Sequence, residues 1–98
     1  MFYNFEWDPH KAQRNLQKHR ISFERAAQVF LDPTALSIPD EEHSLREERW
    51  ITMAKDSQGI VLVVVHTFQK GGEKERIIRL ISARKATKQE LKQYEEGL

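Results

Sequence analysis

The sequence predicts an α+β fold, in which an N-terminal strand and two helices precede an antiparallel meander of strands and a closing helix. Two patterns support this prediction. Residues with helical spacing lie before residue 34, whereas three β-rich runs joined by short connections containing glycine follow it. At 98 residues the chain is long enough for one domain, spanning residues 1–98, with one small core. We therefore expect any functional site to be a shallow surface.

The first third of the chain predicts one strand and two helices. Aromatic and polar residues alternate over residues 2–7, which is typical of a short strand. Asp8 can cap a helix that has Pro9 in its first turn, and the helix should continue to His19. Ser22 is a second N-cap, and the apolar residues after it have the spacing of a buried helical face up to Asp32 and Pro33.

The remaining residues predict the sheet and the closing helix. A short edge strand is expected over residues 34–39. The meander is expected over residues 47–54, 60–68 and 76–83, with hairpin connections at residues 55–59 and 69–73. Thr87 and Glu90 have the spacing of a capping box, so a helix should begin after Thr87.

Three arginines lie in the last strand and its exit, where an unpaired guanidinium is costly to bury. Strand alternation predicts that Arg84 shares a side with Arg76 and Ser82, while Arg79 faces the other way with Ala83. Each must reach water, a carboxylate or an external anion such as phosphate.

The same alternation determines the faces of the first strand of the meander. If Ile51 and Met53 point at the helices, Arg49 joins them, whereas Glu48 lies on the opposite side with Trp50.

Composition excludes several classes of protein. The chain has no cysteine, and therefore neither disulfides nor thiolate chemistry. No apolar run approaches the roughly 18 residues of a membrane span, and Met1 is not followed by a signal pattern, so we expect a cytoplasmic protein. The histidines lack metal-ligand spacing, so neither a metal nor another cofactor is expected. The net charge is +1, with acidic residues enriched in residues 34–58 and basic residues in residues 59–98.

Motifs along nearly the whole chain resemble the BrnT family of toxins from type II toxin–antitoxin systems, whose members have a RelE-like ribonuclease fold. In the first half they are Phe5-Glu-Trp-Asp-Pro9 with Lys11 and Ala12, Asn15 with Lys18-His19, Phe23-Glu24 with Ala26 and Val29-Phe30, and Asp32-Pro33. The second half adds His43-Ser44, Glu47-Glu-Arg-Trp50, Ile81-Ser-Ala-Arg-Lys-Ala86 and Tyr94-Glu95. The chain departs from the family at Arg20, where a glycine often ends the helix in a left-handed conformation, and at Ala54, where glycine is common.

The resemblance implies an endoribonuclease that cleaves RNA without metal and arrests growth. It also implies a partner, a BrnA-like antitoxin whose DNA-binding domain links the complex to operator DNA. The resemblance allows a homodimer or a heterotetramer with the antitoxin. The exposed strand edge at residues 35–38, or the remaining apolar surface, could accept an antitoxin segment. The alternative is a non-catalytic module, a degenerate toxin that binds RNA or protein and regulates by occupancy.

Metal-independent cleavage of RNA needs a base for the 2′-hydroxyl proton, cations for the charge that develops on the phosphate, and an acid for the leaving 5′-oxygen. His19, Glu48 or His66 could transfer protons, although His66 fits better as a strand residue at the sheet margin. Arg49, Arg79 and Arg84 could hold the phosphate.

Each candidate also has a structural interpretation. His19 could simply complement the dipole of its helix, and Arg84 could be a solvated turn residue. Arg49 and Arg79 could form ion pairs, for which the available carboxylates are Glu24, Asp40 and Glu47. For the remaining histidines, His43 fits a loop anchor and His10 an exposed helical turn. Trp50 and Tyr94 fit the core better than a base-stacking role.

Overall fold

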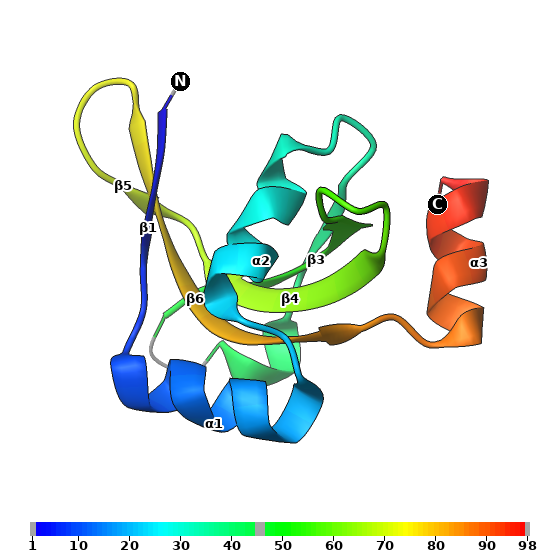
Figure 1. The fold of residues 1–98 in the computed structure, drawn as a ribbon. Coiled ribbons are helices and arrows are strands. Elements are labelled where there is room, and N and C mark those ends of the chain that lie inside the picture. The colour runs from blue at the N-terminus through cyan, green and yellow to red at the C-terminus, as the bar shows by residue number, and fades with distance from the viewer. Residues whose placement is uncertain (1, 45–46, 98) are drawn as a thin grey trace.

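The computed structural model describes residues 2–44 and 47–97, in which three α-helices accompany a mixed sheet (Figure 1). The chain runs through β1 (Phe2–Glu6), α1 (Pro9–His19), α2 (Phe23–Ala27), the 3-10 turn η1 (Gln28–Leu31), β2 (Leu36–Pro39), the 3-10 turn η2 (Glu41–His43), β3 (Arg49–Lys55), β4 (Val61–Thr67), β5 (Gln69–Lys70), β6 (Glu75–Lys85) and α3 (Lys88–Glu96). The predicted α+β class is confirmed. None of the helices in the described ranges is both long and apolar enough to cross a membrane.

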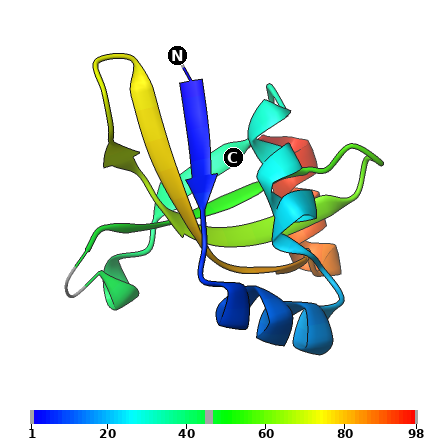
Figure 2. The same cartoon turned by 60° about the vertical axis from the view of Figure 1, so that its left-hand side comes forward.

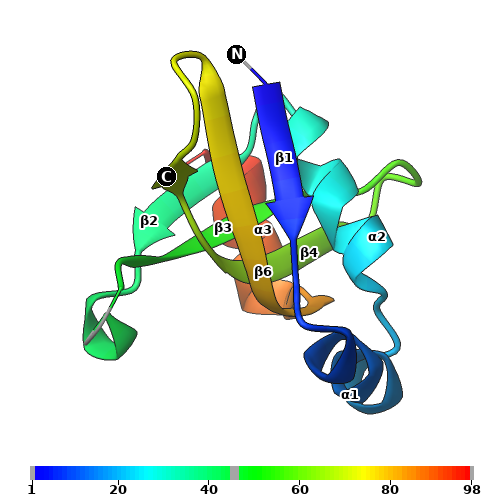
Figure 3. The same ribbon diagram turned by 90° about the vertical axis from the view of Figure 1, so that its left-hand side faces the viewer.

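The sheet has the strand order β1-β6-β4-β3-β2, and β5 pairs with Arg76 and Ile77 near the start of β6. The antiparallel meander of β3, β4 and β6 is confirmed, as is β2 as an edge strand beside β3. β1 runs parallel to β6 and covers only residues 75–79 of it. Figure 3 shows β1 beside β6, with α1 below the end of β1. Among the described residues, no strand therefore lies along the second half of β6 on the edge that β1 occupies in the first half.

Local capping begins α1, α2 and α3 where the sequence predicts them, but the second helix does not remain α-helical up to Asp32. It ends at Ala27 and tightens into the 3-10 turn η1, as is common at the C-terminus of an α-helix. Asp8 accepts a hydrogen bond from the His10 N–H at 2.8 Å, and Ser22 accepts one from Arg25. α1 ends at His19, and the capping residue Arg20 has a left-handed backbone (φ 62°) and donates its N–H to the Leu16 carbonyl at 2.9 Å. Arg20 thus adopts the conformation for which glycine is preferred at a helix end. The capping box of Thr87 and Glu90 begins α3.

The core lies between one face of the sheet and the segment that contains α2 and η1. Its fully buried members are Ile21, Phe23, Ala26, Val29, Ala54, Leu62, Val64, Ile78, Leu80 and Ala83. Figure 1 shows α2 in front of this sheet face and α3 separate from it, on the right-hand side of the view. We call this the helix-covered face.

His66 belongs to this core, and the prediction that it lies at the sheet margin is wrong. Its side chain is fully buried in the central strand β4, with Nδ1 3.2 Å from the Thr67 carbonyl and Nε2 2.6 Å from Thr52 Oγ1. Burial lowers the pKa of His66 to about 4. His66 is therefore neutral at physiological pH and has no exposed position from which to transfer a proton.

A β-bulge in β6 reverses the alternation on which the arginine prediction rested. Val65 pairs with Ser82 and the next residue, His66, pairs with Leu80, so Ile81 is an extra residue. Consequently Leu80 and Ala83 both point into the core, although they differ in parity. Arg84 therefore shares a face with Arg79 and not with Arg76, because the bulge lies between them.

The assignment of faces in β3 is also corrected. Thr52 and Ala54 are fully buried in the core, and the Thr52 hydroxyl contacts the buried His66. Because neighbouring residues alternate, Arg49, Ile51 and Met53 face away from α2. Arg49 thus lies on the same side of the sheet as Arg79 and Arg84.

Candidate functional site

The sheet face opposite α2 carries Arg49, Arg79 and Arg84, and we call it the arginine face. Strand register divides these arginines into two groups. Arg79 lies beside Thr67, whereas Arg84 lies opposite Val63, four residues along β4. At a rise of about 3.3 Å per strand residue, the two positions are about 13 Å apart. Arg79 and Arg84 therefore lie at separate positions along the sheet, and each guanidinium has its own carboxylate partner, Glu47 and Glu90 respectively.

Arg49 and Arg79 form the first group, because they flank Thr67 from its two neighbouring strands. Arg49 pairs with Thr67 in the β3–β4 register, and the backbone N–H of Arg79 donates to Thr67 Oγ1 at 3.4 Å. The Arg79 guanidinium forms an ion pair with Glu47. This confirms the ion-pair alternative for Arg79, with Glu47 as its partner.

Arg49 differs from Arg79 because its Nε–H is buried and has no hydrogen-bond partner among the described residues. A buried donor without an acceptor costs about 1–3 kcal/mol. An oxygen atom that entered this position would recover the lost hydrogen bond. Among the described arginines of this face, Arg49 is therefore the one with a buried donor that has no partner.

Arg84 forms the second group together with Glu90 of α3. Its Nη1 and Nη2 atoms donate to the two carboxylate oxygens at 2.7 and 2.9 Å. These hydrogen bonds raise the pKa of Arg84 and lower the pKa of Glu90 to about 2. Glu90 also accepts the Thr87 N–H at 2.9 Å, so one carboxylate both caps α3 and holds the arginine. The interpretation of Arg84 as a solvated turn residue does not fit this bidentate contact.

The carboxylate that reaches the first arginine group is Glu47 and not Glu48. Glu48 is exposed, and no hydrogen bond or ion pair joins it to another described residue. From the sequence, Glu47 is a candidate only for an ion pair with Arg49 or Arg79. Its sequence signal was the Glu-Glu-Arg motif, which does not tell the two glutamates apart until the strand register is known.

His19 lies at the C-terminal end of α1, where the helix meets the bulge of β6. A shallow groove of about 220 Å³, which we call the α1 groove, is lined on the helix side by Lys11, Arg14, Asn15, Lys18 and His19 and on the strand side by Ile81 and Ser82. Ser82 pairs with Val65. On β4, Val65 lies midway between Thr67, which is beside Arg79, and Val63, which is opposite Arg84. The bulge thus brings His19 to the margin of the arginine face, between its two arginine groups.

Asn15 positions this groove, a role that the sequence did not reveal. Its Nδ2 donates to the Ala83 carbonyl at 2.9 Å and to the Ile21 carbonyl at 3.0 Å, and its Oδ1 accepts the Ala83 N–H at 3.0 Å. Ala83 lies where β6 has no neighbouring strand on its outer edge. The Asn15 amide therefore replaces the missing strand and fixes α1 against β6.

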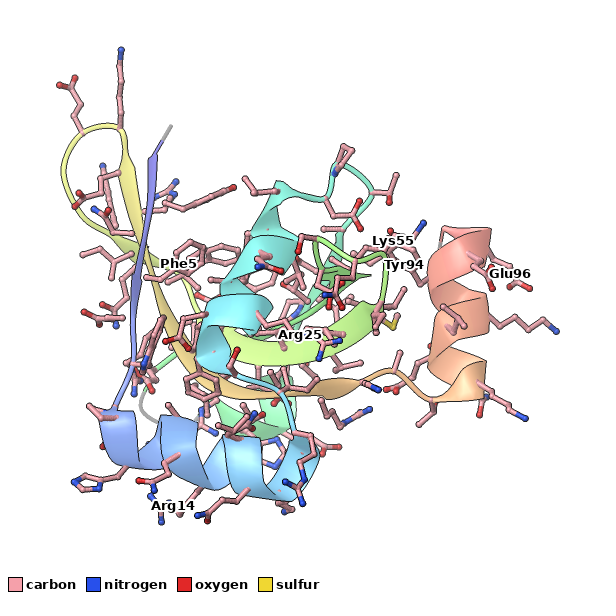
Figure 4. The ribbon with its side chains drawn as sticks, in the orientation of Figure 1. Phe5, Arg14, Arg25, Lys55, Tyr94 and Glu96 are labelled. Atoms are coloured by element: carbon pink, nitrogen blue, oxygen red, sulfur yellow. The ribbon has the colours of Figure 1, made fainter. Side chains whose placement is uncertain are left out.

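The other residues singled out in the sequence have structural positions. His43 Nδ1 lies 3.1 Å from the Asp40 carboxylate, as expected of a loop anchor, and His10 is exposed on the first turn of α1. The Trp50 ring packs edge-on against Phe68. Tyr94 is buried, and its hydroxyl lies 2.6 Å from that of Thr34 (Figure 4).

The site therefore offers cations, a carboxylate and a histidine along a surface that can accept an extended anion. Its charged side chains come from α1, the residues just before β3, β3 itself, β6 and α3. Within residues 2–44 and 47–97, no group of three or more histidine, aspartate and glutamate side chains is arranged to hold a metal ion. The donor types present fit phosphate binding and proton transfer.

Comparison with known proteins gave a match to a family and a match to a solved structure. Residues 7–90 match the family model described as the ribonuclease toxin BrnT of type II toxin–antitoxin systems. The crystal structure of the Brucella abortus ribonuclease toxin BrnT superposes with a TM-score of 0.64 at 21% sequence identity, covering 90% of this chain and 100% of that one. A search of curated proteins gave no significant match.

Proposed function

Because the chain belongs to the BrnT family of ribonuclease toxins of type II toxin–antitoxin systems, we propose that it cleaves RNA on the arginine face, without a metal ion, by general acid–base catalysis. The observation that carries this assignment is the unused, buried Nε–H of Arg49 beside Thr67 and Arg79. A phosphate oxygen is the acceptor that this donor lacks.

In the proposed reaction, a base removes the proton of the ribose 2′-hydroxyl, whose oxygen then attacks the adjacent phosphorus. The bond from phosphorus to the 5′-oxygen breaks, and an acid gives that oxygen a proton. The products are a 2′,3′-cyclic phosphate and a 5′-hydroxyl end. Arg49 and Arg79 stabilise the charge that develops on the phosphate oxygens. Arg84 binds a different phosphate of the same RNA strand, because the strand register places Arg84 about 13 Å from Arg79.

We place proton transfer on His19 and on a glutamate of the Glu47–Glu48 pair. His19 lies beside Ser82 at the margin of the arginine face. Glu47 contacts Arg79, so a phosphate bound by Arg79 would lie close to the Glu47 carboxylate. Glu48, which the sequence favoured, is exposed next to it. Glu47→Gln and Glu48→Gln are matched variants, and the larger loss of cleavage identifies the catalytic carboxylate.

The test is cleavage of a synthetic RNA in excess over purified protein, with a chelator present and the RNA ends identified. Arg49→Ala should lower the rate by about 100-fold or more, as is typical when one charge-stabilising donor is removed. Arg76→Ala is the control, because Arg76 lies in β6 on the opposite side from Arg79. Equal activity in Arg49→Ala and the parent, or activity that is lost in chelator and restored by a divalent ion, would contradict the proposal.

A non-catalytic binding module is the second candidate. It is supported by the fact that Arg79 and Arg84 both have carboxylate partners within the chain, as in structural ion pairs. An enzyme cleaves many RNA molecules per chain, whereas a binding module protects RNA in a fixed ratio. Multiple turnover in the cleavage assay would exclude it.

A type II toxin implies an antitoxin partner, and we propose that the partner is BrnA-like, with a domain that connects the complex to operator DNA. The outer edge of β2 is the proposed contact, because β2 is the last strand of the sheet and Ile38 is 57% exposed on it. Addition of the antitoxin should slow amide exchange at Leu36, Ser37 and Ile38, the residues of β2 that have a backbone N–H. Protection confined to other segments would place the contact elsewhere.

A further inference from the structure

We infer that the α1 groove binds the phosphate backbone of an RNA strand beside the arginine face and provides most of the salt-dependent affinity for RNA. This inference rests on the proposed ribonuclease function and assigns a separate step, the capture of the strand, to Lys11, Arg14 and Lys18 of the groove, which lie outside the proposed catalytic group.

The first observation is the charge of α1. The helix contains Lys11, Arg14 and Lys18 and no acidic residue between Pro9 and His19. The spacing of these three residues, i, i+3 and i+7, places them in one stripe along the helix. They all line the α1 groove. Figure 4 shows Arg14 extending from α1 to the outside of the molecule, where a long anion can reach it.

The second observation is how the cations are paired. All three stripe residues are exposed, and none of the ion pairs between described residues involves α1. By contrast, Arg79 pairs with Glu47 and Arg84 pairs with Glu90. A phosphate must displace a carboxylate to bind either arginine, whereas it displaces only water and mobile ions at the stripe. The stripe is therefore the surface at which binding can begin.

The third observation is that the two surfaces are continuous. Ile81 and Ser82 form the strand side of the groove and lie between Arg79 and Arg84 on the same face of β6. A strand bound along α1 can therefore pass onto the arginine face without crossing a covered element. The two arginine groups, about 13 Å apart along the strand direction, would contact different phosphates of that strand.

The test measures binding of a fluorescent 2′-O-methyl RNA oligonucleotide, which cannot be cleaved because its 2′-oxygen is blocked. The triple variant Lys11→Gln, Arg14→Gln, Lys18→Gln removes the stripe, and glutamine has nearly the same helix propensity as lysine and arginine. The control variant Lys70→Gln, Lys74→Gln, Lys92→Gln removes the same charge elsewhere. Figure 2 shows the β5–β6 hairpin, which contains Lys70 and Lys74, at the opposite end of the molecule from α1.

Each phosphate contact contributes about −0.7 to the slope of log affinity against log salt concentration for a single strand. The slope of the triple variant should therefore be shallower than that of the parent by about 2, which corresponds to about 16-fold over a fourfold change in salt. The control should keep the slope of the parent. An unchanged slope in the triple variant, or an equal change in the control, would overturn the inference, provided that thermal unfolding shows both variants to be folded. Because the probe cannot be cleaved, the result does not depend on whether the protein proves to be a nuclease.

Discussion

Replacement of Asn15 by alanine should destabilise the protein far more than replacement of any exposed residue of α1. Asn15 is 7% exposed and makes three hydrogen bonds to the backbone of Ile21 and Ala83, both of which are fully buried. At about 1 kcal/mol for each bond the loss is about 3 kcal/mol, and buried groups left without a partner can raise it to about 5 kcal/mol. Alanine recovers up to about 0.7 kcal/mol of helix propensity. We therefore expect a net loss of about 2–4 kcal/mol.

This loss is large for a domain of 98 residues, since the free energy of unfolding of such domains is about 5–15 kcal/mol. Urea unfolding followed by tryptophan fluorescence measures it, because Trp7 packs against Phe23 in the core and reports on the folded state. The matched control is Gln13→Ala, an exposed position in the same helix, for which a change within about 0.5 kcal/mol is expected. A loss below about 1 kcal/mol for Asn15→Ala would refute the reasoning that its amide replaces a missing strand.

Asn15→Asp separates the hydrogen bonds from the packing. The carboxylate can still accept the Ala83 N–H, but it cannot donate to the two carbonyls and places a charge beside them. Asn15→Asp should therefore be at least as destabilising as alanine near neutral pH and should regain stability as the pH falls and the carboxyl group is protonated. A variant as stable as the parent at pH 7 would show that the donor side of the amide is unimportant.

Three further predictions concern other contacts. Burial lowers the pKa of His66 to about 4, so the folded state should lose up to about 3 kcal/mol as the pH falls from 6.5 to 4, and His66→Leu should remove this pH dependence in urea unfolding while the exposed His10→Gln keeps it. Arg20→Gly should raise the free energy of unfolding by up to about 1 kcal/mol, because Arg20 has a left-handed backbone (φ 62°) and glycine adopts it without strain. Glu90→Gln preserves the capping box but removes the charge that neutralises Arg84, so binding of uncleavable RNA should tighten by up to about fivefold, the upper range for an exposed ion pair.

A different result would contradict each of these three predictions. A pH profile of His66→Leu equal to that of the parent would mean that another group causes the acid sensitivity. A less stable Arg20→Gly would mean that contacts of the arginine side chain outweigh the backbone strain. Unchanged or weaker RNA binding in Glu90→Gln would mean that Arg84 does not contact the strand.

The sequence by itself determined the features that depend on neighbouring residues. Helix α1 begins after Asp8 and ends at His19, as predicted, and the capping box of Thr87 and Glu90 begins α3. The strands of the meander also lie close to the predicted ranges. Caps, turns and apolar periodicity act over a few residues, so they can be recognised in a single sequence.

Only the tertiary structure decided how the functional side chains are arranged. Strand alternation placed Arg79 and Arg84 on opposite faces, but the extra residue Ile81 returns them to one face, and a bulge is defined only by the register with β4. The bonds of Asn15 to Ala83 join residues 68 positions apart, and the Arg79–Glu47 pair joins residues 32 positions apart. Such contacts depend on which strand edge is left uncovered and which carboxylate the register presents, and neither is encoded in local spacing. The residue types of the site were therefore visible in the sequence, whereas their grouping required the fold.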